Sequence, residues 1–292
     1  MSRSDLVDPA FARELEALRR KLQVRARSGG GGDHLGRRRG GSAEFLEHRP
    51  YAPGDDLRRI DWLAFARTGE PVFKLFRAEE DIVVRLVMDT SQSLDYGSPT
   101  KMLAAKRLAA SVGYMALAQS ERAQVVASSA GDFRMTEPTR GRASLPALLR
   151  DLDALAPHGG TDLARAIDSA VARSPRPGLM VVLSDFLDPG PFDVALTRAA
   201  SAGHDVALVQ VLAQEELEPS FEGDLAFEDA ETSERVEVTV DPRAIDAYLA
   251  RLRGLFATVR AIAKRCRGVY VRTSNVEPAI QAVRRFVARG VD

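Results

Sequence analysis

Oxygen-bearing side chains follow two apolar stretches of the chain. Residues 89–93 read Asp-Thr-Ser-Gln-Ser, so one carboxylate and two hydroxyls occupy the first, third and fifth positions directly after the apolar run 82–88. A second apolar run, 179–183, ends in Ser184-Asp185, and Gly159-Gly160-Thr161-Asp162 stands between the two runs at the start of a helical pattern. Such hard oxygen donors suit Mg²⁺, which takes six oxygen ligands near octahedral geometry and keeps several waters. The set contains no His or Cys, which counts against zinc and copper.

The elements that position these side chains alternate along the chain. Apolar runs predict strands at 82–88, 123–128, 179–183, 205–212 and 269–272, and helical periodicity predicts helices at 101–119, 145–155, 161–173, 192–202, 242–266 and 278–288. This order predicts an α/β fold with a doubly wound, mostly parallel sheet of the Rossmann type flanked by helices. Alternating residues near 224–240 predict a β-hairpin inserted into the domain. Because ligands of such sheets bind at the carboxyl ends of the strands, we expect the three oxygen-bearing loops to meet at that edge.

The chain divides into three segments. Residues 1–40 are expected to form a helix at 11–27 and a flexible, glycine-rich stretch, and Arg19–Arg39 carries eight basic residues against one acid. We interpret this basic stretch as a solvated segment, with nucleic-acid binding as the alternative. Residues 41–78 are irregular and polar, with a Pro-Gly turn signal at 53–54, and alternating apolar residues predict a strand at 72–76. Residues 79–292 hold the predicted α/β domain.

The composition narrows the class of protein. Lys plus Arg and Asp plus Glu both number 41 in 292 residues, and this neutral balance counts against a nucleic-acid partner. The single cysteine, Cys266, excludes an intramolecular disulfide and fits a reducing compartment. The richest apolar stretch, 102–118, is interrupted by Lys106 and Arg107 and is too short for a membrane span, and no signal-peptide pattern opens the chain. The sequence therefore predicts a cytoplasmic protein without a transmembrane segment.

The three oxygen-bearing loops together resemble a known metal site. Asp-x-Ser-x-Ser at 89–93, Gly-Gly-Thr-Asp at 159–162 and Ser-Asp at 184–185 are similar to the metal-ion-dependent adhesion site of von Willebrand factor A domains, and the resemblance covers about residues 80 to 275. It implies a von Willebrand factor A-like fold and five residues that coordinate Mg²⁺ or Mn²⁺: Asp89, Ser91, Ser93, Thr161 and Asp185. Few direct carboxylates leave such an ion under-neutralised, so an acidic group of a protein partner is its expected last ligand. The alternative is a former metal site kept only for folding, with the hydroxyls as helix caps.

The segment before the α/β domain resembles a family signature. The residues that carry this resemblance are Glu44-Phe45, Arg49-Pro50-Tyr51-Ala52-Pro53-Gly54-Asp55-Asp56, Arg58, Ile60-Asp61-Trp62 and Ala66-Arg67. They are similar to the signature of the bacterial domain-of-unknown-function family 58. The resemblance implies a MoxR-type AAA+ ATPase, or its client, as partner, and a role as an adaptor in the assembly or remodelling of protein complexes. The charged residues Arg49, Asp55, Asp56, Arg58 and Asp61 form either a bracing ion-pair network or a surface for a partner, and Trp62 is expected in a core.

An enzymatic function is the main competing hypothesis. An aspartate at a strand end near Mg²⁺ is typical of phosphoaspartyl enzymes, so Asp89 is compatible with Mg²⁺-dependent phosphoryl transfer or hydrolysis. However, Ser91 stands where those enzymes carry a second carboxylate, and no lysine is apparent at the matching strand ends. The Gly-x-Ser-x-Gly pattern of acyl-transfer enzymes is also missing. The sequence identifies no small-molecule substrate and favours a binding module over an enzyme.

Overall fold

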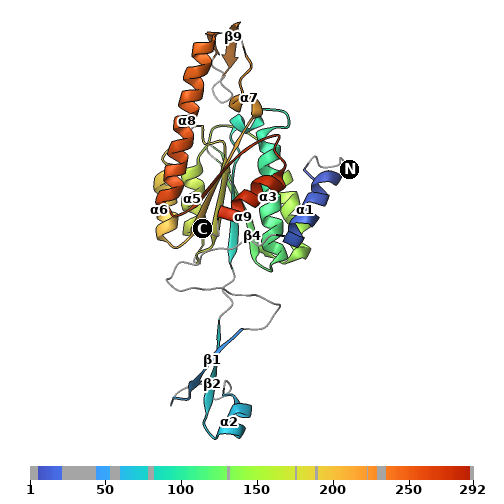
Figure 1. Cartoon of the computed structure of the whole chain (residues 1–292), viewed down its shortest axis with the longest axis vertical. Helices are drawn as coiled ribbons and strands as arrows, with labels where there is room; N and C mark the ends of the chain where they lie inside the picture. Colours follow the sequence, from blue (N-terminus) through green and yellow to red (C-terminus); the bar gives the residue numbers. More distant parts are fainter. Residues whose placement is uncertain are drawn as a thin grey trace. The chain divides into compact units, whose positions relative to one another are not determined.

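The computed structural model describes residues 6–21, 44–52, 60–77, 82–129, 132–174, 176–187, 190–221, 223–228 and 235–289 (Figure 1). The chain forms two units: the larger comprises Met1–Gly30 and Ile82–Asp292, and the smaller comprises Gly31–Asp81. The larger unit contains a layered α/β structure, and the smaller contains a two-stranded sheet with one helix.

The central sheet of the larger unit is mostly parallel, with the strand order β11-β8-β7-β3-β4-β5. Its parallel strands are β3 (Val83–Asp89), β4 (Arg122–Ser129), β7 (Leu179–Ser184), β8 (Asp205–Leu212) and β11 (Val269–Ser274), while β5 (Asp132–Met135) and β6 (Thr139–Arg140) pair antiparallel with β4. Strand β4 pairs with one edge of β3, and the chain then crosses back so that β7 pairs with the other edge of β3. The switch in strand order therefore lies between β3 and β7, and the predicted parallel α/β sheet is confirmed.

Helices cover both faces of this sheet (Figure 1). One face carries α3 (Lys101–Ala118), α4 (Leu145–Asp153), α9 (Ala279–Arg289) and, packed on α3, α1 (Pro9–Lys21); the other carries α5 (Leu163–Ala172), α6 (Phe192–Ser201) and α8 (Pro242–Arg265). Successive strand residues point to opposite faces, so Leu86 and Met88 of β3 join the first core and Val87 joins the second. Each such side chain contributes roughly 1.5–3 kcal/mol by its burial. Burial on both faces explains why these strands are continuous apolar runs rather than alternating ones.

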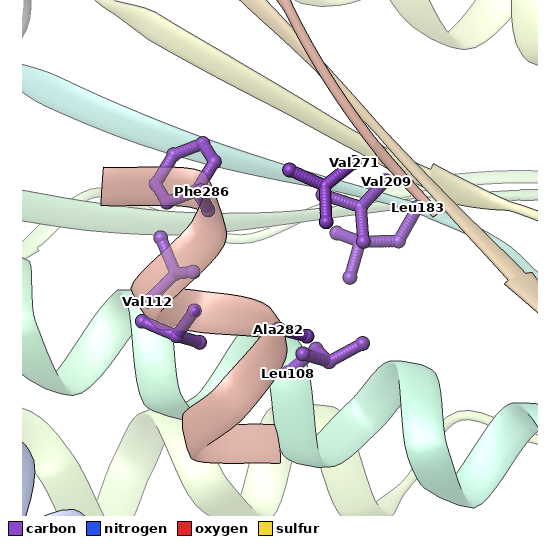
Figure 2. A pocket seen from close by; sticks show the side chains of 8 residues that line it. Leu108, Val112, Leu183, Val209, Val271, Ala282 and Phe286 are labelled. Atoms are coloured by element: carbon purple, nitrogen blue, oxygen red, sulfur yellow. The ribbon is translucent and has the colours of Figure 1, made fainter. Parts of the chain in front are cut away.

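An apolar pocket lies between α3, α9 and the sheet (Figure 2). Leu108 and Val112 of α3, Ala282 and Phe286 of α9 and Val209 of β8 are among the eight side chains that line it. All eight are apolar, and a pocket that binds a polar ligand needs a few placed polar groups. This pocket is a packing gap of the core.

The N-terminal helix α1 is held against the larger unit by its cap and by its apolar face. The Asp8 carboxylate accepts hydrogen bonds from the backbone N–H groups of Ala10 (2.8 Å) and Phe11 (2.7 Å), which would otherwise lack partners at the helix start. Its second oxygen accepts from Arg107 of α3 at 2.7 Å. Phe11 and Leu15 are buried in the core beside α3. The helix expected at 11–27 thus begins at Pro9, and residues 22–43 lie outside the described part of the chain.

A β-hairpin stands beyond the carboxyl edge of the sheet, next to the short helix α7 (Gln214–Leu217) (Figure 1). Its strands β9 (Gly223–Glu228) and β10 (Arg235–Val240) pair with Phe227 opposite Val236 and with Leu225 opposite Val238. These four side chains share one face, while Asp224 and its partner Thr239 lie on the other. The predicted inserted hairpin is confirmed.

The smaller unit pairs β1 (Glu44–Pro50) antiparallel with β2 (Val72–Arg77) and carries α2 (Trp62–Thr68) between them in sequence. Asp61 caps α2 by accepting from the N–H groups of Leu63 and Ala64, both at 3.1 Å. Gly69 ends the helix at φ 74°, a left-handed conformation that glycine adopts without strain.

The expectation that Trp62 lies in a core is wrong, because its side chain is 59% exposed. Trp62 opens a helix of seven residues, of which only Ala64 is buried. A helix of two turns buries one narrow stripe, and the first position lies outside that stripe. The indole ring meets Phe65 edge-on, with ring centroids 6.1 Å apart. None of the helices in the described ranges combines the length and the apolar character needed to cross a membrane.

Candidate functional site

Asp89 lies at the carboxyl end of β3, one of the two strands that flank the switch in strand order. Its side chain is 1% exposed and accepts three hydrogen bonds. Oδ1 accepts from the backbone N–H of Ser91 at 2.9 Å, and Oδ2 accepts from the hydroxyls of Ser184 at 2.6 Å and Thr161 at 3.2 Å. Three separate loops therefore converge on one carboxylate.

Backbone hydrogen bonds fix the loop that follows β3. Thr90 donates its N–H to Ser128 O of β4 at 2.9 Å, and Gln92 donates its N–H to Gly159 O at 2.8 Å. In return, His158 donates its N–H to Thr90 O at 2.8 Å. The loop at 89–93 and the Gly-Gly loop at 159–160 thus hold each other, and this places Thr161 beside Asp89.

The predicted donors form one connected network. Ser91 Oγ lies 3.1 Å from Ser93 Oγ, and Ser93 Oγ donates to Asp185 Oδ2 at 2.9 Å. With the bond from Thr161 to Asp89, all five residues expected to bind a metal lie within one network at the carboxyl edge of β3 and β7. Asp185, at 2% exposure, is as deeply buried as Asp89.

Asp185 is held by an unusual backbone conformation. The next residue, Phe186, has φ 53°, a left-handed value that costs a non-glycine residue roughly 1–2 kcal/mol. Burial of its ring against Phe192, with centroids 5.3 Å apart, offsets this cost. Gln210 of β8 donates to the Asp185 carbonyl at 2.7 Å and accepts from the Tyr270 hydroxyl at 2.7 Å. Strain of this kind is typical of functional sites.

Two charged residues at this edge were not predicted from the sequence. Lys101, the first residue of α3, is 1% exposed, and its Nζ donates to Asp185 Oδ2 at 2.8 Å and to Glu216 Oε1 at 2.7 Å. Glu216 belongs to α7, directly after β8, and its second oxygen accepts from Ala213 N–H at 2.7 Å. The sequence could have indicated Glu216 as a residue of the site, because it follows a parallel strand whose carboxyl end lies at the same edge of the sheet.

The electrostatics of the site are unbalanced. Burial raises the pKa of Asp89 above its ordinary value. The hydrogen bond from Ser184 opposes this shift, and the charge of Asp185 adds to it. Burial alone would lower the pKa of Lys101, but the charges of Asp185 and Glu216 outweigh it and raise that pKa. The three carboxylates and one ammonium group carry two net negative charges when ionised. No described cationic side chain donates to Asp89.

The donor set fits a hard divalent cation. Two carboxylates and three hydroxyls converge, and the hydroxyls already lie within hydrogen-bond distance of the carboxylates or of each other. No group of three or more His, Cys, Asp or Glu side chains suited to a metal occurs in the part of the chain that the structure describes. A cation at this edge would therefore depend on neutral oxygens, as Mg²⁺ and Mn²⁺ sites do more readily than zinc sites.

The other predicted site residues belong to the smaller unit or lie outside the described residues. Asp61 is buried as the cap of α2, and Arg49 Nη1 donates to Pro50 O at 3.4 Å. The remaining three, Asp55, Asp56 and Arg58, lie outside the described residues. Most of the basic stretch Arg19–Arg39 also lies outside them.

Comparisons with known proteins place the chain in a family. An uncharacterized protein of Mycobacterium tuberculosis is 32% identical over 295 residues, which cover 99% of this chain and 92% of that protein, and one of Mycobacterium bovis matches equally. Among solved structures, BatB from Bacteroides thetaiotaomicron has a TM-score of 0.48 at 19% identity and covers 72% of this chain and 98% of that chain. An aerotolerance-related membrane protein from Bacteroides fragilis has a TM-score of 0.47 at 18% identity, with 71% and 99% covered.

The sequence matches carry the assignment. The model of the family described as "Protein of unknown function DUF58" matches residues 47–254, which is most of the chain and includes parts of both units. The signature residues between Glu47 and Arg67 and the donor loops after β3 and β7 fall within this range. The chain belongs to the DUF58 family.

Proposed function

We propose that this protein is a metal-ion-dependent protein-binding module with a von Willebrand factor A-like domain. Asp89, Ser91, Ser93, Thr161 and Asp185 would hold Mg²⁺ or Mn²⁺, and the bound ion would supply an open coordination position for a carboxylate. The observation that carries the proposal is the buried charge at the carboxyl edge of the sheet. Three carboxylates meet there, and Lys101 is the single described cation that bonds any of them.

The charge argument favours a divalent cation over a purely structural network. Leaving a buried carboxylate without a counter-charge costs several kcal/mol, and the raised pKa of Asp89 reflects that cost. A fold that used Asp89 only to cap backbone groups would be equally well served by asparagine. A divalent ion would supply the counter-charge that the Asp89 carboxylate lacks.

The chemistry of the donors indicates what such a site would capture. Ser91, Ser93 and Thr161 contribute neutral oxygens, and the Oδ2 atom of Asp185 is shared with Lys101. A cation held in this way keeps part of its charge, so an anionic ligand gains most from it. The acidic side chain of a protein partner is the expected ligand.

The partner class comes from the family resemblance. We propose a MoxR-type AAA+ ATPase, or a client of it, as the protein captured, with this chain acting as an adaptor in the cytoplasm. The module is proposed to act without catalysis of its own.

The structure places a lysine near Asp89, as the phosphoryl-transfer alternative requires, but the lysine is not positioned to stabilise a phosphoryl group. Lys101 Nζ is bonded to Asp185 and Glu216, and both oxygens of Asp89 already accept hydrogen bonds. Position 91 remains a serine where a second carboxylate would be needed. Turnover of a generic phosphate ester that is lost in Asp89→Asn would restore this alternative.

Isothermal titration of purified protein with MnCl₂ tests the proposal. The wild type is expected to bind about one ion, and Asp89→Ala is expected to lose that binding. Asp95→Ala is the matched control, because Asp95 is an exposed carboxylate in the same loop. Capture of a MoxR-type ATPase should then require both the metal and Asp89. Capture that is equal in wild type and Asp89→Ala, with and without Mg²⁺, would show that the metal role is wrong.

A further inference from the structure

Lys101 occupies a position that physical chemistry disfavours for a cation. It is the first residue of an 18-residue helix, where the helix dipole favours negative charge, and it is 1% exposed. Within the described ranges it is paired with two carboxylates, Asp185 at 2.8 Å and Glu216 at 2.7 Å. One of these two is a proposed metal ligand.

We infer that Lys101 competes with the metal for Asp185 and thereby sets both the affinity of the site and its need for an anionic partner ligand. This inference rests on the proposed function. Lys101 already uses Asp185 Oδ2, the same oxygen that accepts from Ser93. Its ammonium group also repels a nearby divalent ion. Without Lys101, the carboxylates of Asp89 and Asp185 would both be fully available to such an ion, and an acidic partner would gain little by approaching it.

Glu216 controls how strongly Lys101 holds Asp185. Its Oε1 accepts from Lys101, and its position is fixed on two sides. Oε2 accepts from Ala213 N–H, and the Glu216 carbonyl accepts from the Tyr248 hydroxyl at 3.0 Å. While Lys101 divides its bonds between two carboxylates, Asp185 is only partly neutralised. If the Glu216 charge is removed, Lys101 pairs with Asp185 alone.

This arrangement predicts opposite effects of two neighbouring substitutions. Lys101→Met should tighten Mn²⁺ binding by about tenfold, which corresponds to about 1.4 kcal/mol. Glu216→Gln should weaken it by about fivefold. In the Lys101→Met background, Glu216→Gln should have little further effect, because two residues that act through one interaction are not additive.

The experiment measures the dissociation constant of Mn²⁺ by isothermal titration and by the electron paramagnetic resonance signal of free Mn²⁺. Lys106→Met is the matched control, because Lys106 lies on the same helix and donates to the Asp153 carbonyl at 3.0 Å instead. Its Mn²⁺ affinity should equal that of wild type. Far-UV circular dichroism with and without Mn²⁺ checks the fold of each variant. If Lys101→Met does not fold, the sign of the Glu216→Gln effect decides.

Several outcomes would overturn the inference. They are unchanged affinity in both variants, weaker binding by Lys101→Met, or an undiminished Glu216→Gln effect without Lys101. In each of these cases the proposed function still holds if the wild type binds the metal and Asp89→Ala does not. If neither the wild type nor any variant binds the metal, both the proposed function and this inference are refuted.

Discussion

Asp89→Asn should stabilise the metal-free protein while removing its response to Mg²⁺. The substitution keeps the size of the side chain and removes its charge. The asparagine oxygen can still accept from Ser91 N–H. The Ser184 and Thr161 hydroxyls, which donate to Asp89 in the wild type, would instead accept from the asparagine amide group. What is lost is a carboxylate that is 1% exposed and has no described cationic donor.

The expected magnitude follows from two opposing contributions. Burial of an uncompensated ion costs several kcal/mol, while hydrogen bonds to a charged group contribute about 1.5–3 kcal/mol each. Because asparagine keeps weaker versions of these bonds, the contributions largely cancel. We expect a net gain of about 1–2 kcal/mol in the free energy of unfolding, within the range of stabilising changes at functional sites.

The pH dependence has a defined sign. The pKa of Asp89 is raised in the folded state, mainly by burial, above the ordinary aspartate value of 3.8. The folded wild type therefore binds this proton more tightly than the unfolded chain, and its stability falls as pH rises through the folded pKa. The advantage of Asp89→Asn should be full above that folded pKa and should vanish as pH falls to 3.8 and below.

Urea unfolding followed by far-UV circular dichroism provides the assay. In EDTA at neutral pH the variant should be the more stable protein. Mg²⁺ at a hundred times its dissociation constant should add about 2.7 kcal/mol to wild type alone and reverse the order. Asp95→Asn, an exposed change in the same loop, should match wild type in both conditions. A variant less stable than wild type in EDTA at neutral pH would refute the reasoning, because the Asp89 charge would then be stabilising.

Three further predictions concern the stability of the two units. Phe11→Ala should lower the free energy of unfolding by about 3–5 kcal/mol, since this buried ring anchors α1; a change below 1 kcal/mol in urea unfolding would contradict that anchoring. Asp61→Ala should lower the free energy of unfolding by about 1 kcal/mol through loss of the α2 cap, and Asp61→Asn should lower it much less. Equal losses of stability in the two variants would exclude capping as the cause. For Glu277, burial is outweighed by hydrogen bonds from Arg285 and Thr273 that lower its pKa. Its contribution should therefore be present above the ordinary value of 4.5 and lost as pH falls through the folded pKa, so Glu277→Gln should cost about 0.5–1 kcal/mol at neutral pH and nothing in acid.

The sequence predicted the sheet and the donor loops because both depend on local patterns. Strands buried on two faces appear as unbroken apolar runs, and β3, β7 and β8 lie within a residue or two of the predicted ranges. Parallel strands bring their carboxyl ends to one edge, so Asp89 and Asp185 meet although 96 positions separate them in the chain. Their convergence followed from topology alone.

Lys101 and Trp62 show what local patterns do not reveal. A lysine at the start of an alanine-rich helix is typical of a solvated helix end. Its burial depends on Asp185, which directly follows β7, and on Glu216 of α7. An isolated tryptophan is typical of a core, but α2 is too short to bury its first residue. Both outcomes depend on which surfaces the tertiary fold leaves available, and that information is not contained in a window of neighbouring residues.

The exposed indole of Trp62 gives the smaller unit a spectroscopic label of its own. Trp62 is the single tryptophan in 292 residues and lies on α2, whereas every proposed metal donor belongs to the larger unit. Its emission should resemble that of indole in water and should be quenched readily by acrylamide. Loss of this signal in urea reports unfolding of the smaller unit, while circular dichroism is dominated by the helices of the larger one. A change in indole emission on addition of Mg²⁺ would therefore be a direct sign that events at the carboxyl edge of the sheet reach the segment carrying the family signature.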